Sequence, residues 1–467
     1  ALQILKQNKT TIPKGITRDY PKYEVRGFML DVGRKSFDFN TVKEFAKNMA
    51  WYKMNNFHLH LSDNLIFLED YPTMQDAIDN AYAGFRLESD IENLTSEDTF
   101  YTKDEFRSFI KDSRNMGVNI IPEFDMPAHA LAITRAFPNL MTKEAGGNHR
   151  YLIEELDIRK DGALDAAKSV WAQYFEGDDP VFDKDTTVHI GTDEFHGNGG
   201  NEYFRSFSDS MIKYIQGTGR DVRMWGSLSN KNGKTPVASK DVQLNIWNTG
   251  YANPKNMYDL GYDLINTLEG SLYIVPSAGY YSDYLNSQNL YNWVPNNFSG
   301  TVLRAGDKQV LGGTYAIWND QIGTRGNGIT EYDDFDRFFQ PLPSLSEKMW
   351  GEGTDRTYSE MRAVAEKVDT APNTNPYYEA DSVGNDVIDY SFDDEKVYDE
   401  SGNNHESVSE KNVEEVAGKS GNALKLNGGK SYVETPVDMV GPTSGKTAGS
   451  SISMWVKRDA ASDNSEQ

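Results

Sequence analysis

Short β-rich apolar runs alternate with amphipathic stretches from residue 23 to residue 349, and this rhythm constrains the fold more than any other feature. The expected strands are 23–32, 56–62, 118–124, 186–191, 221–225, 242–247, 263–268 and 310–318. The expected helices include Thr41–Met54, Lys103–Met116, Asp161–Tyr174, Glu202–Gln216 and, after the last strand, Asp333–Met349. Eight strands that alternate with helices predict an α/β fold closed as a TIM (β/α)₈ barrel. A doubly wound open sheet is the alternative, but it usually has fewer strands, and no GxGxxG segment follows the first strand here.

The texture of the sequence changes after Lys367. Residues 370–386 hold prolines and scattered Asn and Asp residues, which predict a linker. Short β-like runs separated by Gly and Asn turns follow, and they indicate the start of an all-β antiparallel sandwich. The sequence stops at Gln467 just after one of these runs, so we expect an incomplete sandwich with unpaired strand edges. These runs are 387–392, 423–426, 432–435 and 451–456. The expected organisation is a remnant of a preceding domain at 1–18, a barrel at 19–369, a linker at 370–386 and an incomplete β domain at 387–467.

The balance of charge limits the class of ligand. The 467 residues include 47 Lys and Arg against 71 Asp and Glu, which gives a formal net charge of −24. Such a surface repels phosphate backbones and anionic lipids, so we expect neither nucleic acid nor membrane insertion. No apolar run approaches the roughly 18 residues of a spanning helix. A neutral ligand fits this acidic surface better. The absence of cysteine excludes a disulfide framework and thiol-ligated metals.

Polar and aromatic side chains follow the predicted strands at the edge where a TIM barrel carries its active site. Asp193 and Glu194 come directly after the strand 186–191, and two adjacent carboxylates at a strand end point in different directions. They can therefore perform different tasks on one substrate. Three of the eight tryptophans end other strands, and these are Trp225, Trp247 and Trp318. Because the apolar face of a pyranose packs on an indole, the tryptophans together predict a sugar-binding floor.

Four segments, in the right order, resemble glycoside hydrolase family 20, the family of β-N-acetylhexosaminidases and lacto-N-biosidases. They are Arg26–Val32, Asn56–Asp63, Pro122–Asp125 with His129, and His189–Glu194. With the later tryptophans, the resemblance covers residues 20–350. It implies that a small α/β domain precedes the barrel. The stretch Asp389–Val456 is similar to a concanavalin-like jelly-roll domain.

Departures from the family pattern bear on the substrate. Many members have Gly where Thr192 stands. They also have an acidic residue and a Gly-Trp-Arg segment after the residue that matches Asp63, where this chain has residues 64–67. The segments 82–89 and 192–195 are more similar to the lacto-N-biosidase branch, which releases galactose-β-1,3-N-acetylglucosamine from type-1 glycans. The resemblance therefore favours a lacto-N-biosidase. An exo-β-N-acetylhexosaminidase that releases N-acetylglucosamine is the alternative.

The resemblance implies a retaining, substrate-assisted mechanism, in which the 2-acetamido oxygen of the sugar attacks C1 in place of an enzyme nucleophile. Glu194 would be the general acid and base, which requires a pKa raised toward the working pH. Asp193 would accept the acetamide N–H and stabilise the developing positive charge. Tyr273 would donate its hydroxyl to the acetamide oxygen.

The resemblance also implies substrate-binding and supporting residues. The walls of the acetamido pocket would be Trp225, Trp247 and Trp318, which would hold the reactive geometry. Arg26 and Asp320 would bind ring hydroxyls. Asp63 and His129 would form a pair that tunes Glu194.

Two other classes of protein compete with this hypothesis. His58, His60 and Asp320 fit a metal-dependent hydrolase on the same barrel, but such enzymes need further His ligands, and no histidine lies near Trp225 or Trp247. We therefore expect no metal and no cofactor. A non-catalytic glycan-binding protein would keep the tryptophans, yet this chain also keeps both acids. The expected partner is a neutral oligosaccharide or glycoconjugate with β-linked N-acetylglucosamine, which favours a secreted or cell-surface location.

Overall fold

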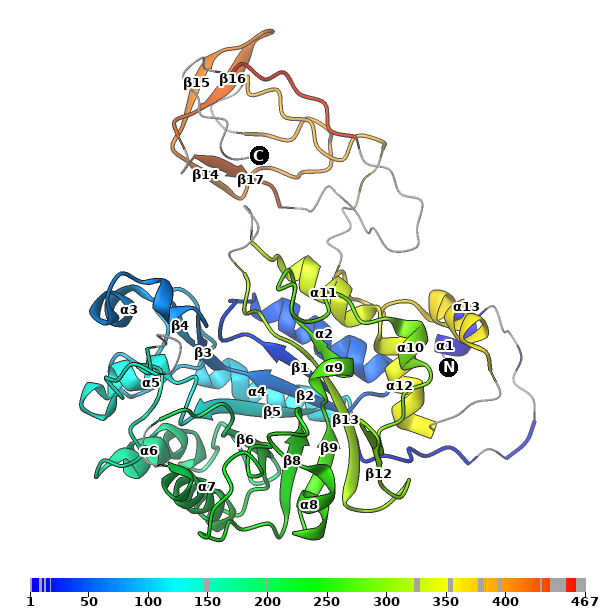
Figure 1. Cartoon of the computed structure of the whole chain (residues 1–467). Coiled ribbons are helices and arrows are strands. Elements are labelled where there is room, and N and C mark those ends of the chain that lie inside the picture. Colours follow the sequence, from blue (N-terminus) through cyan, green and yellow to red (C-terminus); the bar gives the residue numbers. More distant parts are fainter. Residues whose placement is uncertain are drawn as a thin grey trace. The chain divides into compact units, whose positions relative to one another are not determined.

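The computed structural model forms two compact units, Ala1–Pro372 and Asn373–Gln467 (Figure 1). The structure describes residues 2–7, 11, 14–16, 18–146, 151–197, 200–322, 328–351, 356–376, 382, 384–393, 397–428, 431–436 and 451–458. Within these residues, no helix has the length and apolar character needed to cross a membrane.

Eight parallel strands of the first unit close into a barrel. They are β1 (Val25–Asp31), β2 (Asn56–His60), β5 (Asn119–Met126), β6 (Val188–Gly191), β7 (Val222–Trp225), β8 (Val242–Ile246), β9 (Asp263–Asn266) and β13 (Val310–Ile317). The last strand pairs with the first, in a register that runs from Val25 opposite Gly312 to Leu30 opposite Ile317. This closure confirms the predicted TIM barrel and excludes the open sheet.

Short strands extend the rim of the barrel. β10 (Tyr273–Ile274) pairs with the end of β13, which places Tyr273 opposite Ala316. The predicted strand 56–62 continues past β2 into β3 (Ser62–Asn64), which pairs antiparallel with β4 (Ala83–Phe85). A Cβ on Gly84 would lie 2.0 Å from a backbone carbonyl oxygen, so only glycine permits this close approach. The remaining rim pair is β11 (Asn297–Phe298) with β12 (Thr301–Val302).

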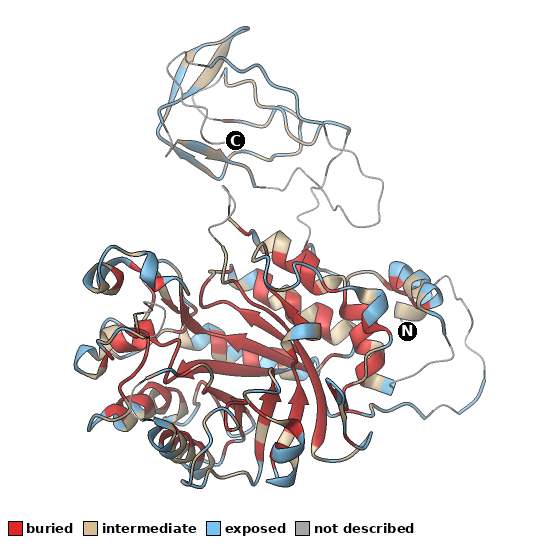
Figure 2. Ribbon diagram, in the orientation of Figure 1, coloured by how far each residue is buried: buried red, intermediate tan, exposed pale blue. Residues whose placement is uncertain are grey.

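Helices cover the outside of the barrel, and their inward faces are buried (Figure 2). The longer helices are α2 (Phe39–Trp51), α4 (Lys103–Asn115), α6 (Ala163–Phe175), α7 (Gly200–Gly217), α11 (Glu331–Phe339), α12 (Leu342–Gly351) and α13 (Tyr358–Val368). The shorter ones are α1 (Leu2–Lys6), α3 (Met74–Asn80), α5 (Leu131–Ala136), α8 (Pro254–Asp259), α9 (Glu269–Leu272), α10 (Ser287–Leu290), η1 (Leu68–Asp70) and η2 (Pro138–Leu140). α4 shows why they form: a Thr102–Glu105 capping box begins it, and Phe106, Phe109 and Ile110 bury its inner face.

The expected single helix Asp333–Met349 is instead two helices, α11 and α12. Pro341 lies between them and has no backbone N–H to continue the hydrogen-bond ladder of α11. The apolar periodicity continues across the break, which is why the sequence pattern alone predicted one element.

The short helix α1 is attached to helices of the barrel. Gln3 Nε2 donates to the carbonyl of Trp51 at 2.6 Å, and Lys6 Nζ donates to the carbonyl of Val368 at 2.9 Å. None of its residues is buried. Its origin in a preceding domain stays a prediction.

The second unit contains two antiparallel pairs, β14 (Ser409–Lys411) with β17 (Tyr432–Glu434) and β15 (Val413–Ala417) with β16 (Asn422–Leu426). The runs predicted at 423–426 and 432–435 correspond to β16 and β17. The runs at 387–392 and 451–456 are not strands, so that prediction was wrong. In the first of these, the side chain of Asp399 takes the backbone N–H of Asp389 that a ladder would need. The jelly-roll assignment stays a prediction.

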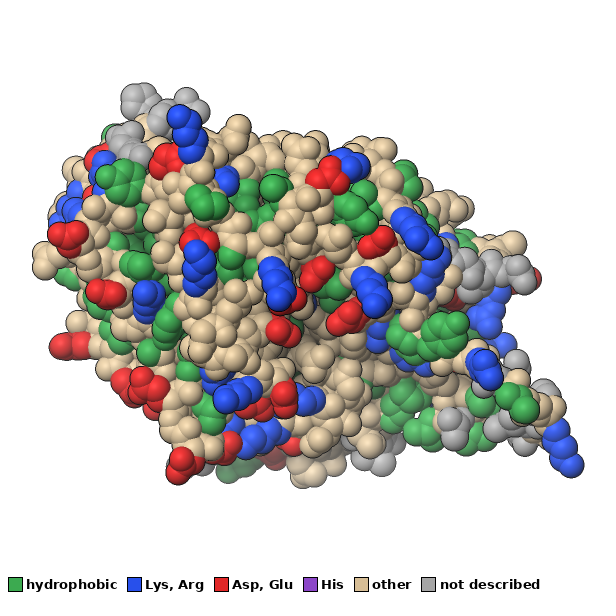
Figure 3. Space-filling model, turned by 90° about the horizontal axis from the view of Figure 1, so that it is seen from below, with side chains coloured by type: hydrophobic (Ala, Val, Ile, Leu, Met, Phe, Trp, Pro, Cys, Tyr) green, Lys and Arg blue, Asp and Glu red, His purple; other side chains and the backbone are tan. Residues whose placement is uncertain are grey.

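Lys and Arg side chains lie close to Asp and Glu side chains over the face seen in Figure 3. The excess of acidic residues is therefore not gathered there into a patch of one sign.

Candidate active site

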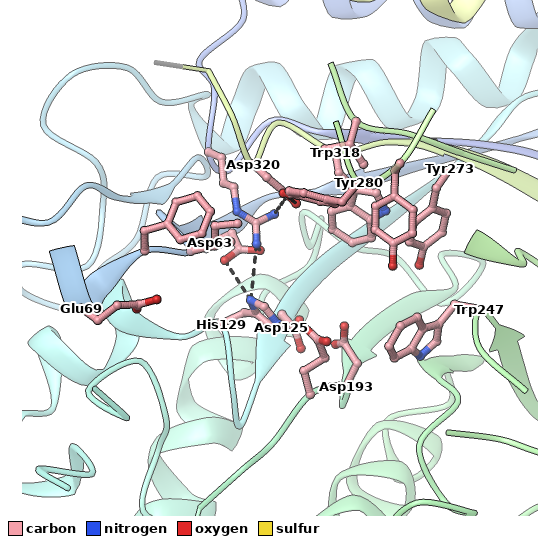
Figure 4. Close-up of a pocket in the computed structure, with 16 residues that line it drawn as sticks. Asp63, Glu69, Asp125, His129, Asp193, Trp247, Tyr273, Tyr280, Trp318 and Asp320 are labelled. Atoms are coloured by element: carbon pink, nitrogen blue, oxygen red, sulfur yellow. Dashed lines mark hydrogen bonds and ion pairs between the residues drawn. The ribbon is translucent and has the colours of Figure 1, made fainter. Parts of the chain in front are cut away.

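A pocket of about 480 Å³ opens at the carboxyl ends of the barrel strands (Figure 4). This volume lies within the range typical of ligand sites. The lining comprises Arg34, Asp63, Ile66, Phe67, Glu69, Asp125, His129, Asp193, Glu194, Trp247, Tyr273, Val275, Tyr280, Tyr281, Trp318 and Asp320. All predicted site residues except Arg26 and Trp225 are therefore brought together in one cavity.

The turn after β6 aims Asp193 and Glu194 differently. Gly191, Thr192 and Glu194 adopt positive φ angles of 72°, 81° and 40°. Such angles are costly for Thr and Glu and cluster at functional sites, where surrounding contacts hold them. One such contact is the backbone N–H of Thr192, which donates to Asp125 Oδ1 at 3.0 Å. The position where many family members have Gly thus carries a strained Thr in this chain.

Asp193 is coupled to Asp125 beneath it. Burial raises the pKa of Asp193 to about 6. Burial raises the pKa of Asp125 well above its ordinary value, and the negative charge of the neighbouring Asp193 raises it further. The two carboxyls are hydrogen-bonded, so Asp125 holds the shared proton and Asp193 carries the negative charge. Among the described residues, Asp193 Oδ1 and Asp125 Oδ2 are both buried and have no other hydrogen-bond partner, which fits two carboxyls that share a proton.

Glu194 is the first member of a chain of titratable groups. His129 Nε2 lies 3.4 Å from Glu194 Oε2, and His129 Nδ1 lies 3.2 Å from Asp63 Oδ1 (Figure 4). Burial opposes the charge of His129, but Asp63 outweighs it and raises the pKa of His129 well above its ordinary value. Burial likewise opposes the charge of Asp63, but Arg34 and His129 hold the pKa of Asp63 well below its usual range. The predicted pair is therefore present as an imidazolium against a carboxylate.

Aromatic side chains form the opposite wall. The rings of Tyr273 and Trp318 lie 5.7 Å apart, and Trp247 is fixed by a hydrogen bond from its Nε1 to the carbonyl of Gly226 at 3.0 Å. Burial raises the pKa of Tyr273 well above its ordinary value, so its hydroxyl stays protonated and able to donate. The hydroxyl end of Tyr273 points into the pocket between Trp318 and Trp247 (Figure 4).

Arg26 does not lie in the pocket, which corrects the sequence-based assignment. It is the second residue of β1, at the opposite end of the barrel, and its guanidinium donates to the carbonyls of Lys53 and Tyr23, each at 2.8 Å. The arginine of the pocket is Arg34, which lies 3.3 Å from Asp320 Oδ1 and 3.0 Å from Asp31 Oδ2. Arg34 follows the end of β1, so the rule that active-site residues follow barrel strands would have identified it.

Trp225 is also outside the pocket. Its side chain is completely buried, and it contacts the underside of Trp318 with ring centroids 5.6 Å apart. Two of the three predicted tryptophans thus line the cavity, and the third supports one of them. From the sequence, a tryptophan at a strand end is expected to point into the barrel, but the sequence does not say whether it lines the pocket or packs beneath it.

Sequence reasoning missed several lining residues. Tyr280 donates its hydroxyl to Asp320 Oδ2 at 3.0 Å, next to Arg34. Phe67 and Glu69 are exposed and lie on the rim formed by the segment after β3. Glu69 lies at the opposite end of the pocket from Trp247 (Figure 4). Tyr280 lies in an irregular segment and Glu69 in the short η1, so no pattern in the sequence pointed to them. Phe67 belongs to the segment 64–67, which the sequence singled out only as a departure from the family pattern.

Three groups of side chains place potential metal-ligand atoms within 4.8 Å of one another. They are His58, Glu123 and His189; His60, Glu123 and Asp125; and Asp125, His129 and Asp193. Glu123 Oε2 already pairs with His58 Nε2 at 2.9 Å and with His60 Nδ1 at 2.6 Å. Hydrogen bonding between imidazoles and carboxylates accounts for this clustering, and the absence of a metal stays an expectation.

The fold and the pocket together define a class, a (β/α)₈ barrel that presents an acid pair and an aromatic wall at its strand ends. Residues 23–352 match the model of glycosyl hydrolase family 20, catalytic domain, and the chain belongs to this family.

Known relatives show the same family. The chain is similar to a lacto-N-biosidase of Bifidobacterium bifidum, with 25% identity over 398 residues that cover 78% of this chain and 32% of the relative. It is also similar to a chitooligosaccharidolytic β-N-acetylglucosaminidase of Ostrinia furnacalis, with 25% identity over 380 residues, 72% of this chain and 58% of the relative. The chain therefore spans between about a third and three fifths of the length of these relatives. In fold, it is similar to a β-N-acetylhexosaminidase of Bacteroides fragilis, with a TM-score of 0.55, 22% identity, and coverage of 77% of this chain and 76% of that chain.

Proposed function

We propose that this chain carries the catalytic domain of a retaining glycoside hydrolase that cleaves β-linked 2-acetamido-2-deoxy sugars with assistance from the substrate. One observation carries the proposal: Asp193, Glu194 and Tyr273 meet in one pocket whose wall is aromatic. A pyranose packed on Trp318 would place its acetamido group between Asp193 and Trp247. The acetamide of the substrate is then the nucleophile, and no side chain of the protein is needed in that role.

Glu194 is proposed to act as the general acid and then as the general base. Its carboxyl group lines the pocket and contacts His129. Asp63 stabilises the protonated, positively charged form of His129. The imidazolium of His129 stabilises the negative charge that forms on Glu194 when its proton moves to the glycosidic oxygen. Proton donation to the leaving group and proton removal from water then use the same carboxyl.

Asp193 and Tyr273 are proposed to hold the acetamide. Asp193 lines the pocket, and its carboxylate would accept the amide N–H, which fixes the carbonyl oxygen toward C1. The protonated hydroxyl of Tyr273 would donate to that oxygen. As the oxazolinium intermediate forms, positive charge develops next to the Asp193 carboxylate and is stabilised by it.

The proposed product is the disaccharide galactose-β-1,3-N-acetylglucosamine. Support comes from the rim of the pocket, where Ile66 and Phe67, of the segment 64–67, stand in place of the Gly-Trp-Arg segment of many family members. The relative from Bifidobacterium bifidum, a lacto-N-biosidase, supports the same choice. Ring hydroxyls would bind Arg34 and Asp320, with Asp320 in the role assigned to it from the sequence. The partner is then a neutral glycan, and a secreted or cell-surface location is part of the proposal.

Incubation with lacto-N-tetraose tests this proposal, with the products separated by mass. A lacto-N-biosidase releases lacto-N-biose and lactose. An exo-β-N-acetylhexosaminidase leaves the tetrasaccharide intact, because its N-acetylglucosamine is capped by galactose, but cleaves the trisaccharide that lacks this galactose. The absence of reaction with both substrates, at any pH at which the chain is folded, would overturn the proposed activity.

A further inference from the structure

His60 joins the pocket to the interior of the barrel. Its Nε2 lies 2.7 Å from Asp63 Oδ2, and its Nδ1 lies 2.6 Å from Glu123 Oε2. The side chain is almost completely buried at the end of β2. Each ring nitrogen therefore faces a carboxylate oxygen at the distance of a short, charge-assisted hydrogen bond.

Two carboxylates on one imidazole fix its protonation state. A neutral imidazole has only one N–H and would leave the other nitrogen lone pair against a carboxylate oxygen. Both contacts are hydrogen bonds only when both nitrogens of His60 carry a proton. Burial on its own lowers the pKa of His60, but Glu123 and Asp63 outweigh it and raise that pKa well above its ordinary value.

The acid pair of the pocket continues into this chain. Glu194 contacts His129, His129 contacts Asp63, and Asp63 contacts His60. We propose that His60 is a permanently protonated positioning residue, which fixes Asp63 against His129 and lowers the cost of deprotonating Glu194. This role extends beyond the pocket to Glu123, which anchors the far side of the imidazolium. It rests on the acid role proposed for Glu194.

Several groups face His60 or share a partner with it. They are Glu123 and Asp125 of β5, Asp63 of β3, Asp31 opposite it on β1, Arg34 and His129 on Asp63, and His58 and His189 on Glu123. Burial lowers the pKa of His58 to about 3 and also lowers the pKa of His189, so both are neutral. The positive charge next to Glu123 is therefore on His60.

His58 offers a matched control for His60. Each histidine donates to Glu123 Oε2, but only His60 also contacts Asp63, and only His60 is charged. The variants His60→Gln and His58→Gln each replace one imidazole next to Glu123 with a neutral amide, which can still donate a hydrogen bond. A difference between them reports the charge and the contact to Asp63 rather than the loss of an imidazole from the barrel.

The pH dependence of kcat/KM provides the readout. The substrate is the methyl β-glycoside of lacto-N-biose or of N-acetylglucosamine, whichever the wild type cleaves, because a methoxide leaving group requires protonation. Loss of the His60 charge makes the potential at Glu194 more negative, so its proton is held more tightly. We expect the alkaline limb to move up by about 0.5–1 pH unit in His60→Gln, the size expected for one charge at intermediate distance in a protein interior. The limb of His58→Gln stays at the wild-type position. An unmoved limb in folded His60→Gln, or equal shifts in both variants, would overturn the proposal.

A second measurement needs neither activity nor a folded His60 variant. ¹⁵N NMR of chain labelled at histidine reports the protonation of both ring nitrogens. In His129→Gln, one imidazolium should persist at pH 9, and that imidazolium is His60. Only neutral imidazoles at that pH would overturn the proposal. Because NMR is independent of turnover, failure here is distinct from failure of the proposed function.

Discussion

Trp225 Nε1 donates a hydrogen bond to Glu123 Oε1 at 2.6 Å, one layer below the floor of the pocket. The indole is completely buried and contacts Trp318, so the position of the floor depends on a polar anchor as well as on packing. His189 Nδ1 lies 3.1 Å from the same oxygen of Glu123. Trp225 donates to one oxygen of this carboxylate, and His58 and His60 donate to the other, which holds the carboxylate in the barrel interior.

The Trp225→Phe substitution should destabilise the chain more than its size change explains. It removes the indole N–H from the charged Glu123, and a hydrogen bond to a charged group contributes about 1.5–3 kcal/mol. Trp171→Phe is the matched control, because Trp171 is equally buried and its Nε1 has no partner among the described residues. Urea unfolding should show a loss for Trp225→Phe that exceeds the control by at least about 1 kcal/mol. Equal losses would mean that Glu123 does not depend on this bond.

Glu194→Gln should lower kcat on natural glycans by about 10²–10⁴, because the amide cannot protonate the glycosidic oxygen. The loss should be smaller on a nitrophenyl glycoside, whose leaving group needs little protonation. Parallel kinetics on the two substrates provide the measurement. If both rates fall by the same factor, Glu194 is not the general acid.

A thiazoline analogue of the N-acetyl sugar should inhibit far more tightly than the parent sugar. Its ring resembles the oxazolinium intermediate, and a site complementary to a high-energy species binds its mimic preferentially. For a lacto-N-biosidase, the galactosyl form should surpass the monosaccharide form in competitive inhibition assays. A complete lack of inhibition by either compound would contradict assistance by the substrate and the roles of Asp193 and Tyr273.

The sequence predicted the barrel because strands that alternate with helices form a parallel sheet, and eight of them favour a closed barrel over an open sheet. It predicted Asp193 and Glu194 because they follow a strand. It misplaced Arg26, because that assignment followed the family motif, whereas Arg26 lies near the start of β1 and active-site residues follow strand ends. It also misplaced Trp225, since burial depth depends on the strands opposite it. The rim residues Phe67 and Tyr280 come from irregular loops, whose paths are set by tertiary contacts rather than by local pattern.

Asp334, on the inner face of α11, should make stability depend on pH. Burial raises its pKa to about 7, from 3.8 for the exposed group. The folded state therefore binds this proton more tightly than the unfolded state. The contribution of Asp334 to the free energy of unfolding is fully present below pH 3.8 and is lost as pH rises through about 7. Asp334→Asn stays neutral throughout. Relative to the wild type, the variant should gain about 2–4 kcal/mol in free energy of unfolding between pH 4 and pH 8.5. Denaturant titrations at both pH values test this, and a constant difference would contradict it.

The rim of the pocket should set the size of the released product. Phe67 and Glu69 are exposed residues of the rim, and Glu69 lies at the opposite end of the cavity from Trp247, which with Asp193 and Tyr273 is proposed to hold the acetamido group (Figure 4). Phe67 offers an apolar face to a second pyranose, and Glu69 offers acceptors for its hydroxyls. Binding energy from this remote sugar raises kcat when it is realised in the transition state.

We therefore expect a nitrophenyl β-lacto-N-bioside to be cleaved at least about tenfold better, in kcat/KM, than the nitrophenyl N-acetylglucosaminide. That ratio corresponds to only about 1.4 kcal/mol of added transition-state binding, a modest demand for one extra sugar. Phe67→Ala and Glu69→Gln should each reduce the ratio, with little effect on the monosaccharide substrate. Asp70→Asn is the control, because this neighbouring exposed acid does not line the pocket. The inverse preference in the wild type would define an exo-β-N-acetylhexosaminidase and leave the fold and the acid pair untouched. A high ratio that survives both rim substitutions would instead place the second sugar elsewhere on the rim.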